Sequence, residues 1–257
     1  ALGRCALGAL RGMRRRSWSG QNGCAACSIS TPAVRRGDAG GVRQALLAPT
    51  RYASLFTMSL EPVFTPARTR AATHPVDAVR GFVFSSGRKW FQEHGLMERY
   101  VDLLPAAVRD RAFTITALEW LPVDLAMTCY HACDAMDLPA SDQRELGRVV
   151  SSANNGALIE TIARLAGGLG VSPWVALKDL NKVWLRSNRG GAVAIYKATE
   201  RSARIEMWRV PMAASSFFCT SMCGAIEGGI RLFRKSASVS EVREERTADG
   251  LTLTATW

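Results

Sequence analysis

The sequence predicts an α+β fold, in which an N-terminal helical half packs on a small antiparallel sheet and a strand–strand–helix–strand–strand unit follows it. Apolar and polar residues alternate over 193–198 and 203–209 around a polar turn, as they do in two paired antiparallel strands. The alternation returns over 238–246 and 251–257, and between the two pairs 215–233 has apolar residues at helical spacing. This order is typical of a helix packed across an antiparallel sheet.

The helix expected over 215–233 contains Gly224, Gly228 and Gly229, each of which costs roughly 1 kcal/mol relative to alanine in a helix interior. Close packing is the expected compensation, because a glycine face lets the helix backbone approach a sheet or a ligand. Apolar contacts would come from Phe217, Phe218, Met222, Ile226 and Ile230. The Gly224–Gly228 spacing also occurs in membrane dimers, but the uncharged stretch here is shorter than the ~18 residues that a span needs.

The residues before the sheet are expected to form a succession of helices. A short apolar run at 79–84 is a strand candidate, and a helix capped by Ser85 or Ser86 begins after it and extends to residue 94. Further helices are expected over 96–104, 121–136, 143–152, 158–169 and 174–186. Prolines at or near the starts and glycines near the ends of these segments follow the usual asymmetry of helix termini.

Charge divides the chain at Met58. Residues 1–57 include nine arginines, no lysine and one acid, and therefore carry +8 of the net charge of +11. Three explanations of this segment are a mis-called start with translation beginning at Met58, a disordered or interacting arm, and an organelle transit peptide. We expect residues 58–75 to be an extended lead-in and residues 76–257 to form one α+β domain of the ligand-binding type. Because the residues after 57 carry only +3, no nucleic-acid partner is expected.

Two pairs of cysteines are candidates for a metal site. Cys129 and Cys133 are four residues apart on one expected helix, as are Cys219 and Cys223 on another, so each pair would share a helix face. Four thiolates could ligate zinc if the two helices met, but structural zinc sites use tighter spacings on loops. Buried free thiols in a reducing compartment are the favoured alternative, and we expect no metal.

The three histidines of the chain offer one candidate haem ligand. Only His131 lies in the middle of an expected helix, and a packed or solvated role for it is favoured over haem ligation. We therefore expect no cofactor. No nucleophile elbow or similar local signature supports a catalytic set, so no catalytic residue is assigned. The glycines at 167–170 follow a helix rather than a strand and lack the Lys-Ser/Thr ending of a phosphate loop.

Aromatic residues in the C-terminal half suggest where a ligand would bind. Apolar and aromatic walls characterise small-molecule pockets. If the helices and the sheet leave a cavity, we expect its walls to include Trp184, Trp208, Phe217, Phe218 and Met222.

Several short segments carry a family resemblance. They are VRGFVF at 79–84, LLP at 103–105, ELGR at 145–148, SPW at 172–174, ARI at 203–205, the helix at 224–230 and Trp257. Across residues 76–257 these positions resemble a paralogous family expanded in myxobacteria. That family is similar to the superfamily of haem nitric-oxide-binding domains, vinyl-reductase-type ligand-binding domains and TRAPP trafficking subunits.

The resemblance implies a helical half on a small antiparallel sheet, with a hydrophobic cavity available to a ligand. The Tyr-x-Ser-x-Arg motif that binds the haem propionates in the nitric-oxide sensors is absent from this sequence. A cysteine ligand set like that of some vinyl-reductase relatives is also absent. Both departures reduce the expectation of haem or metal.

The function that we expect is non-enzymatic binding of an unknown small apolar ligand, in a sensory or regulatory role. The alternative is a protein–protein interaction or dimerisation module without a ligand, and a homodimer is compatible with both. An enzymatic role ranks third. Because no signal peptide precedes Met58 and no apolar stretch is long enough to span a membrane, we expect a cytoplasmic protein.

Overall fold

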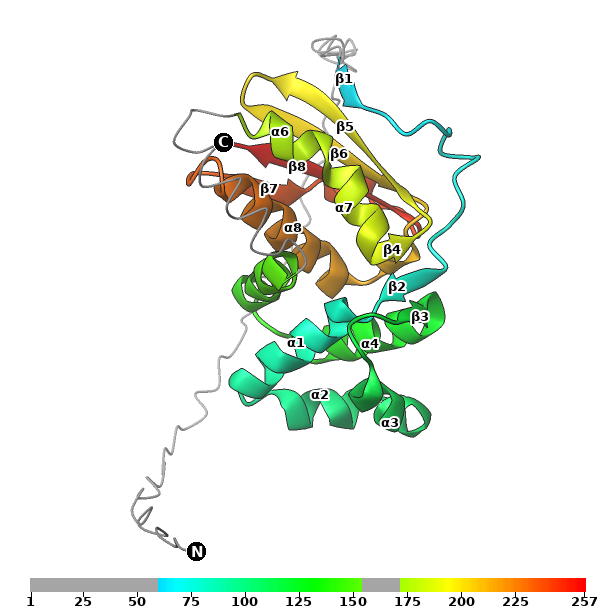
Figure 1. The fold of residues 1–257 in the computed structure, drawn as a ribbon. Coiled ribbons are helices and arrows are strands. Elements are labelled where there is room, and N and C mark those ends of the chain that lie inside the picture. The colour runs from blue at the N-terminus through cyan, green and yellow to red at the C-terminus, as the bar shows by residue number, and fades with distance from the viewer. Residues whose placement is uncertain (1–59, 154–171) are drawn as a thin grey trace, which may run out of the picture. The chain divides into compact units, whose positions relative to one another are not determined.

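The computed structural model describes residues 60–153 and 172–257 and confirms the predicted α+β class (Figure 1). The segment 1–57 and the helix predicted over 158–169 lie outside the described residues. None of the helices in the described part of the chain combines the length and the apolar character needed to cross a bilayer.

The larger sheet is antiparallel and has the strand order β1-β5-β6-β8-β7. Its strands are β1 (Glu61–Phe64), β5 (Ala192–Thr199), β6 (Ser202–Trp208), β8 (Gly250–Thr256) and β7 (Ser238–Glu241). In the centre, Ile205 lies opposite Ile195 on one side and Leu253 on the other, and all three are fully buried. The predicted alternation therefore places the core face of the sheet correctly.

Two differences from the prediction concern the edges of this sheet. The strand expected over 238–246 ends at Glu241, and a 3₁₀ turn, η2 (Arg243–Glu245), follows it. At the opposite edge, β1 lies within the expected lead-in and pairs with β5. Its four residues include Pro62 and none of them is buried, so they carry little of the apolar alternation by which a strand is recognised.

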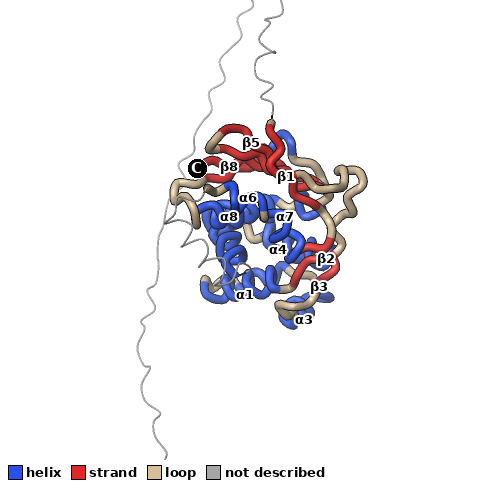
Figure 2. Tube along the Cα trace, turned by 45° about the horizontal axis from the view of Figure 1, so that its top comes forward, coloured by secondary structure: helices blue, strands red, loops and turns tan. Residues whose placement is uncertain are grey.

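The helix α8 (Ser216–Arg231) lies against the core face of the sheet, where it contacts β7 and β8 (Figures 1 and 2). Ser215 caps its N-terminus, because its Oγ accepts a hydrogen bond from the backbone N–H of Phe218 at 3.1 Å. The preceding turn is η1 (Pro211–Ala214). The helix α7 (Leu180–Ser187) covers β5 on the same face and follows the short α6 (Trp174–Lys178). The single helix predicted over 174–186 is thus two helices that meet at Asp179.

The N-terminal half contains α1 (Phe82–Glu93), α2 (Met97–Leu103), α3 (Ala106–Thr114), α4 (Val123–Ala135) and a helix at 140–153. A small antiparallel sheet joins this half to α7, with the order β3 (Trp120–Pro122), β2 (Ala78–Arg80), β4 (Asn188–Arg189). The strand predicted at 79–84 stops at Arg80, and α1 begins four residues earlier than expected. At Gly81, an added Cβ would lie 1.9 Å from the carbonyl oxygen of Thr116, so a side chain cannot be accommodated where strand gives way to helix.

Candidate functional site

A cavity of about 320 Å³ lies between the helices and the core face of the larger sheet. Its floor includes Val193 of β5 and Met207 of β6. Its walls come from α1, α4, the helix at 140–153, α6, α7 and α8. The wall residues that these helices contribute include Val83, Tyr130, Leu146, Val150, Leu177, Leu180, Val183, Trp184, Phe217, Phe218, Met222, Ala225, Gly229 and Ile230, and Phe233 lines the cavity from the turn after α8.

The helix α8 supplies the longest wall. Phe218, Met222, Ala225 and Gly229 line the cavity at intervals of three or four residues, so one stripe of α8 faces it, and Phe233 in the turn after α8 continues the series. The aromatic end of this stripe is fixed by ring packing. The ring of Tyr130 on α4 lies 5.4 Å from that of Phe218 in an edge-on arrangement and 6.4 Å from that of Phe217.

The opposite wall is built around Trp184 of α7. Its indole Nε1 donates a hydrogen bond to the carbonyl of Gly190 at 3.1 Å, which satisfies the only polar atom of a nearly buried ring. The Nδ2 of Asn188 donates to the Trp184 carbonyl at 3.2 Å. The first bond ties α7 to the turn that leads into β5, and the second ties it to Asn188 of β4, so this wall is anchored at the end of α7.

Four of the five residues expected to line a cavity, Trp184, Phe217, Phe218 and Met222, are lining residues of this cavity. Trp208 is not among them. On β6 the buried positions are Ala203, Ile205 and Met207, so Trp208 belongs to the alternate set that faces away from the core. Its Nε1 donates to Glu206 at 3.2 Å on that outer face. The prediction of a strand here was correct. The prediction that Trp208 faces the cavity was wrong, because side chains alternate between the two faces of the sheet and Trp208 lies on the outer one.

The described part of the cavity wall is almost without charge. Asp179 is its one carboxylate, and its Oδ1 lies 2.6 Å from the Nζ of Lys182 in an exposed pair. Within residues 60–153 and 172–257, no lysine, arginine or histidine lines the cavity. Burial raises the pKa of the Tyr130 hydroxyl, so this tyrosine stays neutral. Such a wall suits an uncharged ligand, because a buried charge would lack a partner.

One lining residue has an unsatisfied polar atom. The Oγ of Ser221 on α8 is buried and has no hydrogen-bond partner among the described residues. A buried hydroxyl without a partner costs free energy, and most such groups in proteins are satisfied. Ser221 is therefore a lining residue whose hydroxyl has hydrogen-bonding capacity that the described residues do not use.

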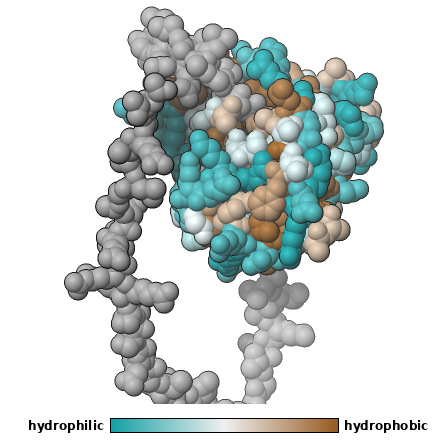
Figure 3. Space-filling model, turned by 60° about the horizontal axis from the view of Figure 1, so that its bottom comes forward, coloured by the Kyte–Doolittle hydropathy of each residue, from teal (hydrophilic) through white to brown (hydrophobic). Residues whose placement is uncertain are grey.

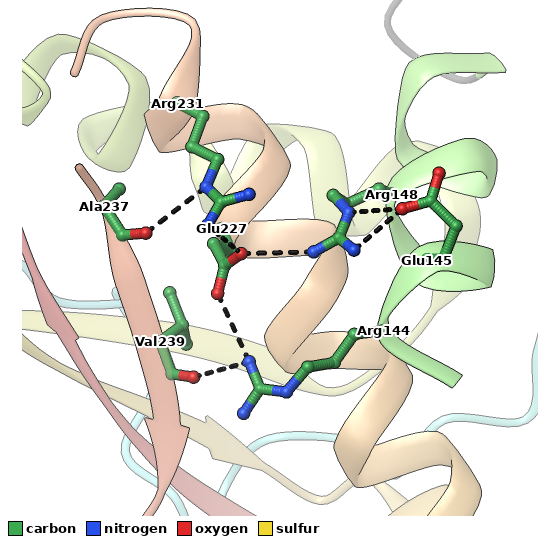
Figure 4. A network of polar contacts seen from close by, with 7 residues as sticks. All are labelled: Arg144, Glu145, Arg148, Glu227, Arg231, Ala237 and Val239. Carbon is green, nitrogen blue, oxygen red and sulfur yellow. Dashed lines mark hydrogen bonds and ion pairs between the residues drawn. The ribbon is translucent and has the colours of Figure 1, made fainter. Parts of the chain in front are cut away.

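Two lining helices, α8 and the helix at 140–153, are held together by a charged cluster that the sequence analysis did not identify (Figure 4). Glu227 of α8 is 6% exposed and makes ion pairs with Arg144 at 3.3 Å, Arg148 at 3.1 Å and Arg231 at 2.9 Å. Arg144 also donates to the carbonyl of Val239 on β7. The sequence contains one sign of this cluster. Glu227 is the lone acid in an apolar helix, and Arg231 follows it four residues later, at the interval that allows an ion pair.

Glycines allow the same two helices to approach closely. A Cβ added to Gly147 would lie 1.9 Å from the Ser221 carbonyl oxygen, and one added to Gly224 would lie 2.0 Å from the Arg144 carbonyl oxygen. Neither position can therefore hold a side chain without separating the helices. The compensation expected for Gly224, close backbone packing, is found here, although the partner is a helix rather than the sheet.

The two cysteine pairs do not form a metal site within the described residues, where no three of histidine, cysteine, aspartate and glutamate come together. Cys129, Cys133, Cys219 and Cys223 are all free and buried. Burial raises the pKa of Cys219 to about 12 and that of Cys223 to about 11. Both groups are therefore protonated thiols at neutral pH.

The fold is that of an H-NOX-like α+β domain. No family model matches the chain, and no curated protein matches it. Among solved structures, an unliganded Fe(II) H-NOX point mutant from K. algicida matches with a TM-score of 0.50 and 11% identity, over 69% of this chain and 95% of that chain. The resemblance to haem nitric-oxide-binding domains is thereby confirmed at the level of the fold.

Two further H-NOX structures match less closely. The K. algicida H-NOX protein without that mutation has a TM-score of 0.46 and 10% identity, over 69% of this chain and 95% of that chain. An oxygen-bound H-NOX domain related to soluble guanylate cyclases has a TM-score of 0.43 and 17% identity, over 69% and 94%. At these identities the likeness concerns the fold alone.

The described part of this chain offers no histidine to ligate a haem in the cavity. All three histidines of the sequence are described, and none lines the cavity. His131 lies on the exposed side of α4, where its Nδ1 is 3.8 Å from Asp134. The ring of His94 stacks on Trp90 at 3.9 Å, and the Nδ1 of His74 contacts the Pro75 carbonyl. The described cavity wall also offers no arginine or lysine to pair with two propionates.

Proposed function

We propose that this chain is a non-enzymatic binding domain that holds a small, uncharged, apolar molecule in the cavity beside α8 and serves a sensory or regulatory role. The observation that carries the proposal is the cavity itself, whose aliphatic and aromatic walls come from helices of both halves of the fold. Its volume of about 320 Å³ lies at the lower end of the range typical of ligand sites.

The character of the walls supports the ligand class. Trp184, Phe217, Phe218 and Met222 are the residues that we propose to contact the ligand. Their side chains are apolar, and the ring packing and the Trp184 hydrogen bond hold three of them in place before any ligand arrives. A preformed apolar wall reduces the ordering cost of binding. Haem is not proposed as the ligand, because no histidine lines the cavity and its described wall has no arginine or lysine to pair with the propionates.

The test uses the full chain and the neutral apolar dye Nile red. We expect saturable binding with increased fluorescence, and native mass spectrometry should show any small molecule that co-purifies. Ala225→Leu places three more carbons in the cavity. If these displace ligand contacts worth about 0.8 kcal/mol each, binding weakens by about 2 kcal/mol, roughly thirtyfold.

The matched control is Ala107→Leu on α3, which makes the same change at an exposed residue outside the cavity wall. We expect its dye affinity to equal that of the wild type. Equal affinity for the wild type and both variants would mean that the dye binds elsewhere and would contradict the proposal. Thermal unfolding of each variant shows whether the fold is retained.

The alternative is an interaction module without a ligand. Phe113 and Leu118 are 48% and 83% exposed near α3, and Val175 and Leu185 are each 50% exposed on α6 and α7. On the face shown in Figure 3, however, apolar patches are interspersed with hydrophilic residues. A ligand-free homodimer in light-scattering measurements, with no dye binding, would favour the interaction module.

Two narrower proposals concern the origin and location of the protein. We propose membership of the myxobacterial paralogous family, on the segments between residues 79 and 257 that carry the resemblance. We also propose a cytoplasmic location, because the four described cysteines are free thiols, as in a reducing compartment. We also propose that residues 1–57 are a separate leader, that residues 58–75 are an extended lead-in whose strand β1 joins the larger sheet, and that residues 76–257 form one domain.

A further inference from the structure

The three glycines of α8 have different surroundings. Gly224 and Gly228 face the helix at 140–153, where an added Cβ would lie 2.0 Å from the Arg144 carbonyl oxygen and 3.3 Å from the Cγ of Arg148. Around Gly229, by contrast, no heavy atom of the described residues lies within 4 Å of an added Cβ, apart from its chain neighbours and the adjoining backbone of α8. Helix packing therefore accounts for the first two glycines and leaves Gly229 without a structural reason.

Helix termination does not account for Gly229 either. The glycines with positive φ are Gly95, Gly190 and Gly191, among the residues that the structure describes. Gly229 keeps ordinary helical geometry within the last turn of α8, which continues to Arg231. Any residue could adopt this backbone, and alanine would favour the helix more than glycine does.

The position of Gly229 in the cavity offers a reason. Gly229 is a lining residue on the stripe of α8 that faces the cavity, one turn after Ala225 and one turn before Phe233. The space that its missing side chain leaves is therefore cavity space. We propose that Gly229 determines how long a ligand the cavity admits, and that the ligand is an uncharged molecule with an extended apolar body.

The charge of the ligand follows from the same wall. A carboxylate or phosphate would meet no lysine, arginine or histidine among the described lining residues, and Asp179 would repel it. A cation would find Asp179 already paired with Lys182. This inference rests on the proposed function and adds to it a ligand class and a residue that limits ligand length.

The experiment measures the affinity of n-alkanols from hexanol to tetradecanol by displacement of Nile red from the full chain. In the wild type, each added CH₂ should tighten binding roughly fourfold until the cavity is filled, after which affinity stops rising. Gly229→Ala should bring that limit about one carbon earlier, and Gly229→Leu about three to four carbons earlier. Short alkanols should bind all three proteins with similar affinity.

The matched control is Gly87→Ala in α1. Gly87 is also a helical glycine with no described heavy atom within 4 Å of an added Cβ, but it does not line the cavity. Both alanine variants should raise thermal stability, and only the Gly229 variants should change the length limit.

The outcomes separate the two proposals. Absence of alkanol and dye binding in the wild type would overturn the proposed function, and with it this inference. Length-dependent binding with the same limit in the wild type, Gly229→Ala and Gly229→Leu would overturn the role of Gly229 alone. If Gly229→Leu does not fold, Gly229→Ala carries the same test with a smaller shift. Tighter binding of alkanoate than of alkanol of equal length would overturn the uncharged ligand class.

Discussion

Replacing Glu227 by glutamine should remove much of the energy that holds α8 to the helix at 140–153. The substitution keeps the shape of the side chain and removes its charge. Glu227 is 6% exposed, whereas its partners Arg144, Arg148 and Arg231 are 29%, 28% and 46% exposed. At an effective dielectric constant near 20, each pair at this separation attracts by about 5 kcal/mol before desolvation and arginine–arginine repulsion are subtracted.

Most of that attraction is offset. Removing one partner of a fully buried ion pair costs about 3–5 kcal/mol, because the other charge is left unpaired. Here the arginines are partly hydrated and can recover some solvation, so we expect Glu227→Gln to lower the free energy of unfolding by about 2–3 kcal/mol. The two arginines of the helix at 140–153 would also lose their charged contact with α8.

Urea unfolding followed by circular dichroism measures this loss, with the midpoint shifting and the m-value unchanged. The control is Glu93→Gln, which breaks the exposed Lys89–Glu93 pair at 3.9 Å and should cost less than about 0.5 kcal/mol. A loss below about 1 kcal/mol for Glu227→Gln would refute the reasoning. It would show that the desolvation of the cluster cancels its attraction.

Three further predictions concern single residues of α8. Ser221→Ala should leave the free energy of unfolding unchanged or raise it by up to about 1 kcal/mol, because the buried hydroxyl of Ser221 has no described partner. Urea unfolding measures this change, and a clear loss of stability would mean that the hydroxyl has a hydrogen-bond partner. Gly224→Ala should lower the free energy of unfolding by more than about 3 kcal/mol, because the added Cβ would overlap the Arg144 carbonyl oxygen. An unchanged free energy of unfolding would mean that the two helices separate easily. Burial raises the pKa of Cys223 to about 11, so the folded state retains a proton that the unfolded state loses above about pH 9. The stability that this thiol contributes is present below pH 9 and is lost as the pH rises to 11. Cys223→Ala should therefore make the loss of stability between pH 9 and 11 less steep by up to about 1.4 kcal/mol per pH unit, and an unchanged slope would contradict the shift.

The sheet and α8 could be predicted because their signals are local. Alternation along β5, β6 and β8 reports which residues face the core, and Ser215 marks the start of α8. The strand β1 could not be found in this way, since its register depends on β5 more than a hundred residues away. The helix α3 was also missed, because its residues show little periodic separation of apolar and polar positions.

The site could be predicted in part for the same reason. The helical periodicity of apolar residues predicts that Phe217, Phe218 and Met222 lie on one helix, with their side chains on its apolar side. The contact of Glu227 with Arg144 and Arg148 joins positions about eighty residues apart, and no local pattern specifies it. Trp208 shows that residue type alone does not predict a lining residue. Its aromatic character suggested a place in the cavity wall, but the alternation of side chains along β6 puts it on the opposite face of the sheet.

The strand order of the larger sheet couples its completion to a late segment of the chain. β8 follows all the other strands in sequence, yet it lies between β6 and β7 and is the neighbour through which β7 joins the sheet. Until residues 250–256 have been synthesised, β6 has an unpaired edge and β7 has no strand with which to pair. A chain truncated before residue 250 should therefore lose cooperative folding of α8 and the strands that it contacts. It should not behave as an intact domain that lacks one strand.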